Sequence, residues 1–223
     1  MAARRTRLQG LLAKLARSHG ESQGGPPRDP WQAILYENVA YLCSDEARQR
    51  AFETLRSSTG LEASVIAMAP DELLLAATGH GKMAAQRTAK LRQCAQLFAS
   101  VGDPRQLVRL PLAKARAALK RFPGIGDPGA DRLLLFAGAE PLLALESNGL
   151  RTLLRLGYGR EHANYAATYR SVQQAAAAQV PGTAKARVQL YFVARTHGQQ
   201  VCRARPLCEV CAVAADCPFA QRP

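Results

Sequence analysis

The C-terminal segment carries the residues with the clearest metal-binding chemistry. It reads CRARPLCEVCAVAADCPF, and its cysteines follow the spacing C-x5-C-x2-C-x5-C. Four thiolates this close along a loop can enclose one compact centre, either a [4Fe-4S] cluster or a tetrahedral Zn²⁺, and the spacing alone leaves both open. In a reducing compartment such clustering favours a metal site over disulfides. The predicted ligands are Cys202, Cys208, Cys211 and Cys217.

A second segment, FPGIGDPGAD at Phe122–Asp131, places glycines and prolines between two helical stretches. Gly124 and Gly126 permit positive φ and a close approach of the backbone, and Pro128 is tolerated in the first turn of the helix that follows. The free amides at the start of that helix form a seat for an anion such as a DNA phosphate. The simpler alternative is an ordinary corner between two helices that binds nothing.

The charge composition points to a polyanionic partner. The chain has 30 Lys+Arg against 17 Asp+Glu in 223 residues, a formal net charge of +13. Such an excess is typical of nucleic-acid-binding proteins, although a general preference for arginine would also produce it. No apolar run reaches the length of a membrane span, and the basic N-terminus lacks the apolar core of a secretory signal. We therefore expect a cytoplasmic, nucleoid-associated protein of bacterial type with no membrane partner.

The elements that must position these residues are helical almost throughout. A basic amphipathic helix is expected over residues 1–17, with Leu8, Leu11, Leu12 and Leu15 at helical spacing, and a breaker-rich linker follows it. No convincing pair of strands appears. The further helices that the periodicity predicts are 31–43, 45–57, 61–68, 70–78, 82–100, 104–109, 112–121, 128–138, 148–156, 161–178 and 183–197.

The hairpin segment resembles that of the helix-hairpin-helix DNA glycosylases, the superfamily of endonuclease III and the mismatch adenine glycosylases, whose hairpin reads Leu-Pro-Gly-Val/Ile-Gly. Three more segments resemble that superfamily in the same order: WQAILYENVAYLCSD, ATGHGKMAAQRTAKL and GAEPLLALESNGLRTLLRLG. With the cysteine tail, the likeness extends from about Trp31 to Cys217.

The resemblance implies an all-α fold with two lobes and a C-terminal four-cysteine metal loop. One lobe would comprise residues 1–29 and 141–223, and the other, residues 30–140, would carry the hairpin. It also favours a [4Fe-4S] cluster over zinc, because the superfamily ends in a C-x6-C-x2-C-x5-C loop that binds such a cluster. The first gap here is one residue shorter. The cluster would hold Arg203 and Arg205 on a loop that contacts DNA phosphates. In the hairpin, the backbone of Gly124, Ile125 and Gly126 would contact a phosphate in the same way.

Two glutamates match the positions of carboxylates that act in the superfamily. Glu146 stands where the superfamily has an aspartate near the sugar, and Glu37 where the adenine glycosylases have the glutamate that protonates the base. Breaking an N-glycosidic bond needs a negative charge near a sugar that becomes cationic and a proton for the departing base. Without the resemblance, Glu146 would be a residue that stabilises a helix N-terminus, and Glu37 a solvated acid. With it, Tyr41, on the same side of the helix as Glu37, could stack on a base or wedge beside it.

Bifunctional members use a lysine after the hairpin as nucleophile, and the matching residue here is Pro128. The sequence therefore predicts a monofunctional DNA glycosylase, active as a monomer on double-stranded DNA with a damaged or mispaired base. Two alternatives stay open. One is a DNA-binding protein that keeps the fold without the chemistry, and the other is a bifunctional glycosylase and lyase that uses a different amine, such as Lys82.

Overall fold

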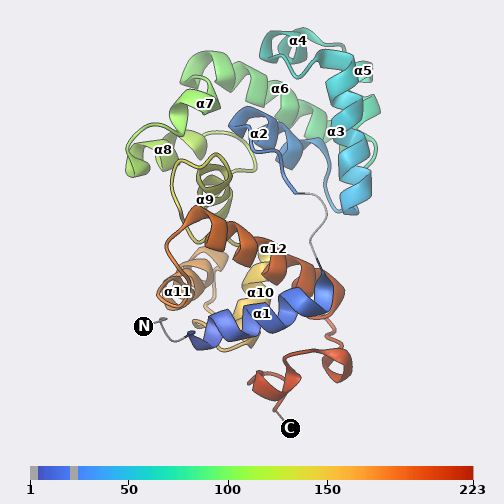
Figure 1. The fold of residues 1–223 in the computed structure, drawn as a ribbon. Coiled ribbons are helices and arrows are strands. Elements are labelled where there is room, and N and C mark those ends of the chain that lie inside the picture. The colour runs from blue at the N-terminus through green and yellow to red at the C-terminus, as the bar shows by residue number, and fades with distance from the viewer. Residues whose placement is uncertain (1–4, 21–24, 223) are drawn as a thin grey trace. The chain divides into compact units, whose positions relative to one another are not determined.

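The computed structural model describes residues 5–20 and 25–222 (Figure 1). The regular elements of these residues are all helices, so the expected all-α class is confirmed. The chain divides into two compact units, one of residues 1–25 and 140–223 and one of residues 26–139. Each is described by itself below. Among the described residues, no helix combines the length and the apolar character that a membrane span requires.

The unit of residues 26–139 is built around α2, which packs against α3, α6, α7 and α9. Its core contains large side chains that are fully buried, among them Trp31, Ile34, Phe52, Leu74 and Leu91. The helices are α2 (Pro30–Val39), α3 (Asp45–Thr59), α4 (Ala63–Met68), α5 (Asp71–Thr78), α6 (Ala84–Val101), α7 (Pro104–Leu107), α8 (Leu112–Leu119) and α9 (Asp127–Phe136).

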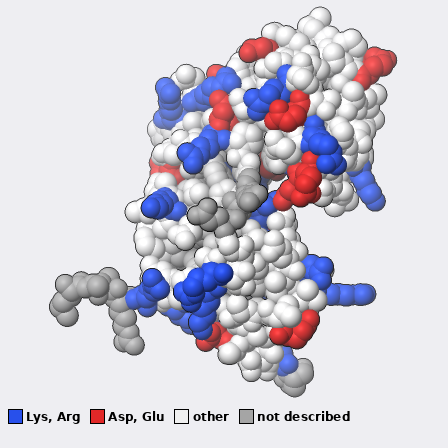
Figure 2. Space-filling view, turned by 45° about the vertical axis from the view of Figure 1, so that its right-hand side comes forward, with Lys and Arg blue, Asp and Glu red and all other residues white. Residues whose placement is uncertain are grey.

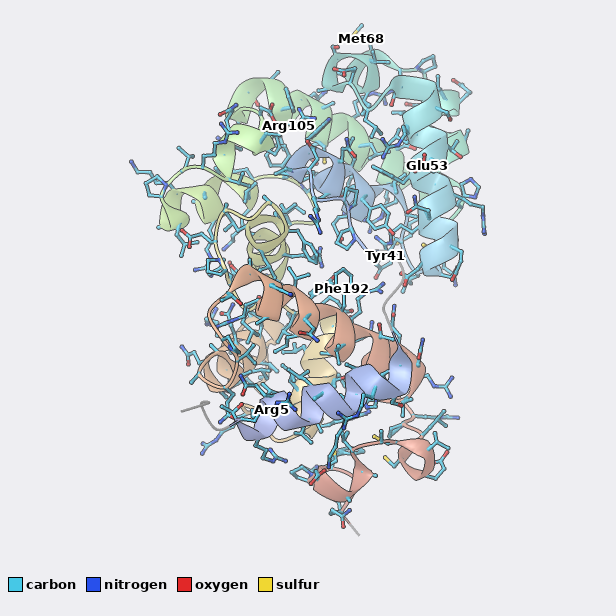
Figure 3. All side chains as sticks on the ribbon, in the orientation of Figure 1. Arg5, Tyr41, Glu53, Met68, Arg105 and Phe192 are labelled. Atoms are coloured by element: carbon cyan, nitrogen blue, oxygen red, sulfur yellow. The ribbon has the colours of Figure 1, made fainter. Side chains whose placement is uncertain are left out.

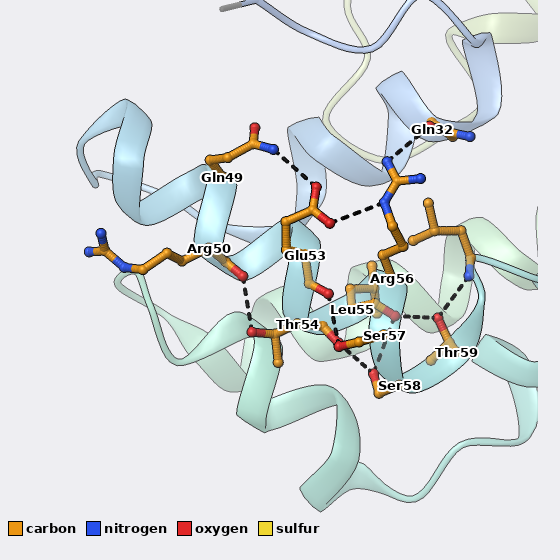
Figure 4. Close-up of polar contacts among 11 residues, drawn as sticks. Gln32, Gln49, Arg50, Glu53, Thr54, Leu55, Arg56, Ser57, Ser58 and Thr59 are labelled. Atoms are coloured by element: carbon orange, nitrogen blue, oxygen red, sulfur yellow. Dashed lines mark hydrogen bonds and ion pairs between the residues drawn. The ribbon is translucent and has the colours of Figure 1, made fainter.

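Polar side chains fasten α3 to itself and to α2 (Figure 4). Glu53 accepts hydrogen bonds from Gln49 at 3.0 Å and pairs with Arg56 at 3.3 Å, while Arg56 also reaches Gln32 on α2. The Thr59 hydroxyl donates back to the carbonyl of Leu55 at 2.7 Å. These contacts end α3 in an orderly last turn, which Gly60 closes in the left-handed conformation.

The other unit is formed by α1 (Arg7–His19), α10 (Ser147–Arg155), α11 (Tyr165–Ala177) and α12 (Ala184–Gln200), with short 3₁₀ turns at Cys208–Val210 and Ala214–Asp216. Helix α12 packs against both α10 and α1. The expected leucine stripe of the first helix is buried in this core at Leu8, Leu11 and Leu15. The helix begins at Arg7 and not at residue 1, because Thr6 and Gln9 form a capping box there; residues 1–4 lie outside the described part.

Helix α2 is shorter than the periodicity predicts. It ends at Val39, and Ala40 is extended, whereas the sequence pattern continues to residue 43. Leu42 follows Leu35 and Val39 at helical spacing, but it has a positive φ of 47° and is 66% exposed. The backbone carbonyl of Tyr41 instead accepts a hydrogen bond from the Lys82 N–H at 2.8 Å. A contact between segments far apart in the sequence therefore replaces the last turn of the helix.

Candidate functional site

The hairpin joins α8 to α9 through a tight turn. Gly124 has a positive φ of 76°, and the Ile125 N–H bonds to the Phe122 carbonyl at 3.2 Å. Phe122 and Ile125 are both buried, so they anchor the turn in the core. Gly126 precedes the first residue of α9 and supplies no side-chain cap. Such a helix start can take an anion against its backbone amides.

Asn38, which the sequence analysis missed, holds the hairpin from α2. Its side-chain amide is fully buried and donates to the carbonyls of Ile34 at 3.0 Å and Pro123 at 2.8 Å. A Cβ atom at Gly124 would lie 3.1 Å from the Asn38 Oδ1 atom, which is buried and has no hydrogen-bond partner in the described structure. The only hint in the sequence is an asparagine next to Val39 near the end of a largely apolar helix.

Acidic side chains next to the hairpin form ion pairs with basic side chains. Asp127, in the first turn of α9, forms an ion pair with Lys120 at 2.5 Å. The buried Asp131 is paired with Arg116 at 2.6 Å, which joins α9 to α8. Pro128 occupies the first turn of α9, where its missing N–H costs no intrahelical bond.

Glu37 lies on α2 and forms an ion pair with Arg132 of α9 at 2.8 Å. The side chain of Arg132 is only 11% exposed and that of Glu37 is 25% exposed. The sequence pattern alone predicts a solvated acid at Glu37. The structure differs, because it gives Glu37 a nearly buried cation as its partner. In this pair the carboxylate is the acceptor and the guanidinium the donor.

Two loops next to Glu37 expose large apolar side chains. Tyr41 is 39% exposed beyond the end of α2, where Figure 3 labels it, and the guanidinium of Arg87 lies 4.6 Å from its ring centre. Leu42 and Met83 both have positive φ, at 47° and 63°, and both are exposed. Burial lowers the pKa of Arg87. Bulky residues in left-handed backbone are uncommon, because this conformation costs energy that the surrounding structure must offset.

Glu146 lies in the other unit and caps the N-terminus of α10. Its Oε1 atom accepts the Gly149 N–H at 2.6 Å, and its Oε2 atom accepts the backbone N–H of Asn148 at 3.0 Å and the side-chain amide of Asn148 at 2.8 Å. The carboxylate is half-buried and fixed by three donors.

Arg151 connects the start of α10 to the cysteine segment. Its guanidinium donates to the Asn148 Oδ1 atom at 2.7 Å, to the Gly198 carbonyl at 2.8 Å and to the Cys202 carbonyl at 2.9 Å. Neither Asn148 nor Arg151 was predicted as a site residue. Their spacing from Glu146, two and five residues along a helix start, was the available signal.

The four cysteines of the C-terminal segment line one small cavity together with apolar side chains of the same unit. Burial raises the pKa of the thiols of Cys208 and Cys211, and neighbouring cysteines raise them further. Within the described residues, no three His, Cys, Asp or Glu side chains converge closely enough to be recognised as holding a metal ion. The donor set of four thiols on one cavity suits a thiolate-bound centre.

Arg155 organises the backbone of this loop. It donates to the Arg203 carbonyl at 2.6 Å and to the Ala204 carbonyl at 3.2 Å, and it lies 3.5 Å from the Cys202 sulfur. The side chains of Arg203 and Arg205 are consequently exposed to solvent. The predicted residues thus fall into two groups: Glu146 with the cysteines and these arginines, and Glu37 with Tyr41 and the hairpin.

Solved structures with the same arrangement of helices are DNA glycosylases. The chain aligns with a trapped endonuclease III–DNA covalent intermediate at a TM-score of 0.75 and 17% identity, over 96% of this chain and 95% of the other. It aligns with a thermostable thymine-DNA glycosylase at 0.74 and 17% identity, over 95% of each chain. It also aligns with the H. pylori 3-methyladenine DNA glycosylase bound to 1,N6-ethenoadenine, at a TM-score of 0.61 and 16% identity, over 86% of this chain and 95% of the other.

No protein-family model matches the sequence, and no curated protein sequence does either. At these low identities the likeness rests on the order and packing of the helices. These agree over nearly the whole length of both endonuclease III and thymine-DNA glycosylase. The chain therefore has the fold of the helix-hairpin-helix DNA glycosylase superfamily.

Proposed function

We propose that the protein is a base-excision-repair DNA glycosylase that hydrolyses the N-glycosidic bond of a damaged or mispaired base flipped out of duplex DNA. The observation that carries this proposal is the Glu146 carboxylate, fixed at the N-terminus of α10 within a fold whose solved examples act on DNA bases. A base inside a duplex is out of reach of such a side chain, so the reaction requires that the nucleotide leave the stack.

Glu146 is suited to stabilise the cationic sugar and to bind the attacking water. At about 4 Å and an effective dielectric constant near 20, one carboxylate stabilises a developing positive charge by roughly 4 kcal/mol, about a thousandfold in rate. A carboxylate has about four acceptor sites. The donors from Asn148 and Gly149 use three of them, which leaves room for one water molecule on Oε1.

The DNA contacts that we propose come from both units. The amides at Gly124, Ile125 and Gly126 would bind a backbone phosphate without a side-chain charge. Tyr41, with the neighbouring exposed Leu42 and Met83, would insert between bases, since apolar side chains of this kind can wedge open a base step. Figure 2 shows many Lys and Arg side chains on the surface that it presents, in keeping with a polyanionic partner.

Glu37 is the proposed contact to the departing base. In its pair with Arg132 it is an acceptor, so it would first receive a hydrogen bond from the base or from water. For Glu37 to deliver a proton, the bound base would have to displace Arg132 from it, and the carboxylate would have to take up a proton from water before passing it to the base. This makes Arg132 a residue that decides when Glu37 can act as an acid.

The chemistry that we propose is monofunctional. The residue after the hairpin that would form a covalent bond to the sugar is Pro128, which has no primary amine, and the nearby Lys120 is paired with Asp127. Water held by Glu146 is then the nucleophile. Lys82 remains the amine to test if strand cleavage is found.

The four cysteines would hold a [4Fe-4S] cluster, with Zn²⁺ as the alternative metal. Support comes from the thiol donor set on one cavity and from Arg155, which already holds the loop that carries Arg203 and Arg205. A bound cluster would supply structural order to this loop. The two exposed arginines would then meet DNA phosphates from a fixed backbone.

The test is a panel of labelled duplexes carrying uracil, hypoxanthine, alkylated purines, oxidised pyrimidines and mismatches, scored with and without hot alkali. We expect alkali-dependent cleavage of at least one duplex. The variant Glu146→Gln should lose turnover and retain DNA binding, whereas Glu161→Gln, an exposed glutamate of the same unit, should behave as the parent.

A second candidate function is DNA binding without catalysis. It is favoured by Pro128, by Asp127 next to the hairpin, and by the glutamate at position 146 in place of the superfamily's aspartate. Tight binding with no product on any duplex would support it and would contradict the glycosylase proposal.

A further inference from the structure

His197 is a buried imidazole that the proposed reaction does not use. It lies on α12 and is 2% exposed. Its Nε2 atom is 3.6 Å from the Cys211 sulfur, and its Nδ1 atom is 2.9 Å from the Nε2 atom of His19 on α1. The Nδ1 atom of His19 is in turn 3.1 Å from the side-chain oxygen of Gln200. Three side chains thus extend from Cys211 towards the exterior.

The chemistry of these groups fixes where the protons lie once Cys211 binds a metal. A metal-bound thiolate has no proton and can only accept a hydrogen bond. His197 must then carry its proton on Nε2 to donate to the sulfur, which leaves its Nδ1 atom as an acceptor. The donor to that acceptor is the Nε2–H of His19, whose Nδ1 atom then accepts a hydrogen bond from Gln200 once that side-chain amide turns its NH2 group towards the ring. Each step follows from the one before, so the sulfur and His19 together select one tautomer of His197.

The ring of His197 has one polar neighbour at each nitrogen, the Cys211 sulfur at Nε2 and His19 at Nδ1. A neutral imidazole has one donor and one acceptor, the number of hydrogen bonds that the two neighbours require.

We propose that His197 is a positioning residue of the metal centre that donates a hydrogen bond from Nε2 to the Cys211 sulfur, in a tautomer held by His19. This inference rests on the proposed [4Fe-4S] cluster. It makes the N-terminal helix α1 part of the metal site, although no cysteine lies on that helix.

The expected consequence is a higher reduction potential of the cluster. Reduction adds a negative charge that spreads onto the ligand sulfurs. An N–H donor therefore stabilises the Cys211 sulfur more strongly in the reduced cluster than in the oxidised cluster. Removing the donor should therefore shift the potential to a more negative value. Removing His19 should shift the reduction potential in the same direction but by a smaller amount. His197 then keeps its ring but loses the partner that fixes its tautomer.

The experiment is film voltammetry of the purified full-length protein, in which the electrode supplies the electron, with iron and sulfide content measured on each sample. The variants are His197→Phe, which keeps a ring without a donor, His197→Gln, which keeps an N–H near the same position, and His19→Phe. His162→Phe is the control, since the side chain of His162 is exposed in the same unit.

We expect a negative shift for His197→Phe, a smaller one for His19→Phe, and values near that of the parent for His197→Gln and His162→Phe. Equal potentials in all variants with full iron content would overturn the hydrogen-bond proposal and leave the cluster intact. Iron-free parent protein would overturn the cluster and this inference with it. Base excision is scored separately on the duplex panel, so neither result is confused with a failure of the glycosylase proposal.

Discussion

Arg151 donates a hydrogen bond from Nε to the carbonyl oxygen of Cys202 over 2.9 Å. The same guanidinium holds Asn148, whose amide groups donate to Glu146, so the candidate carboxylate and the cysteine segment share one polar chain. The variant Arg151→Met removes three hydrogen bonds from this chain. At about 1 kcal/mol for each bond, we expect a loss of roughly 3 kcal/mol in the free energy of unfolding.

Thermal denaturation followed by circular dichroism measures this loss. The matched control is Arg160→Met, because Arg160 is exposed on the same unit. Turnover of Arg151→Met should also fall, since Asn148 loses the partner of its side-chain oxygen. A variant with the stability and turnover of the parent would show that the polar chain does not couple the two sites.

Glu146 has two roles that substitution can separate. Glu146→Gln keeps an oxygen that can accept the Gly149 N–H, but its amide nitrogen cannot accept the two N–H groups of Asn148, so the helix cap should be weakened by about 1–2 kcal/mol. Because the negative charge is gone, turnover should fall by about two to three orders of magnitude. Glu146→Asp keeps the charge and is itself a good cap, so it should retain measurable turnover.

Single-turnover assays on the duplex that gives product measure these changes, and melting temperatures report on the cap. If Glu146→Gln and Glu146→Asp lose turnover equally while both remain folded, the charge at position 146 is not what drives the reaction.

The sequence was sufficient for most helices because their apolar spacing is strong and their ends carry standard signals. Leu8, Leu11 and Leu15 lie in the core as their spacing indicates, and Thr6, two residues before Leu8, caps the helix. Leu42 shows the limit of this reasoning. Its spacing continues the stripe of α2, but the preceding Tyr41 bonds through its backbone to Lys82, and periodicity within one helix does not contain that contact.

The same limit applies to the candidate site. Glu146 could be named from its segment, while its fixed orientation depends on two amides of α10 that act only once the helix has formed. Glu37 could be named too, but its partner Arg132 comes from α9, far along the chain. Asn38 was overlooked because an amide in a helix is usually exposed, and only the packed hairpin gives it carbonyls to bind.

Gly124 is expected to be sensitive to any side chain. Its φ of 76° is unfavourable for other residues, and a Cβ atom there would lie 3.1 Å from the Asn38 side chain. Gly124→Ala should therefore lower the free energy of unfolding by about 1–2 kcal/mol. It should also lower the affinity for duplex DNA. Gly126→Ala is the control for stability, since its Cβ atom meets only the Pro128 ring at 3.8 Å.

Urea denaturation and fluorescence anisotropy with a labelled duplex measure the two effects. Gly124→Ala with the affinity of the parent would argue that the hairpin backbone does not contact DNA.

Gly198 gives the sharpest steric test, because it lies inside α12 where alanine would ordinarily be preferred. Exchanging a glycine for alanine in a helix interior usually stabilises by about 0.5–1 kcal/mol. At Gly198 the new Cβ atom would lie 2.4 Å from the Asn148 carbonyl oxygen and 2.7 Å from its carbon, both backbone atoms of α10. The two helices would have to separate, so we expect Gly198→Ala to destabilise the protein at the level of overpacking in a core, about 1–3 kcal/mol or more.

The control for Gly198→Ala is Gly10→Ala in α1, a helical glycine of the same unit with no atom within 4 Å of the position of a new Cβ atom. This variant should melt at or above the temperature of the parent. Because Asn148 is displaced only in Gly198→Ala, that variant alone should also lose turnover beyond what its lower stability explains, when it is assayed well below its melting temperature. Equal melting temperatures for the two variants would mean that α10 and α12 do not pack at the closeness on which the orientation of Asn148, and through it of Glu146, depends.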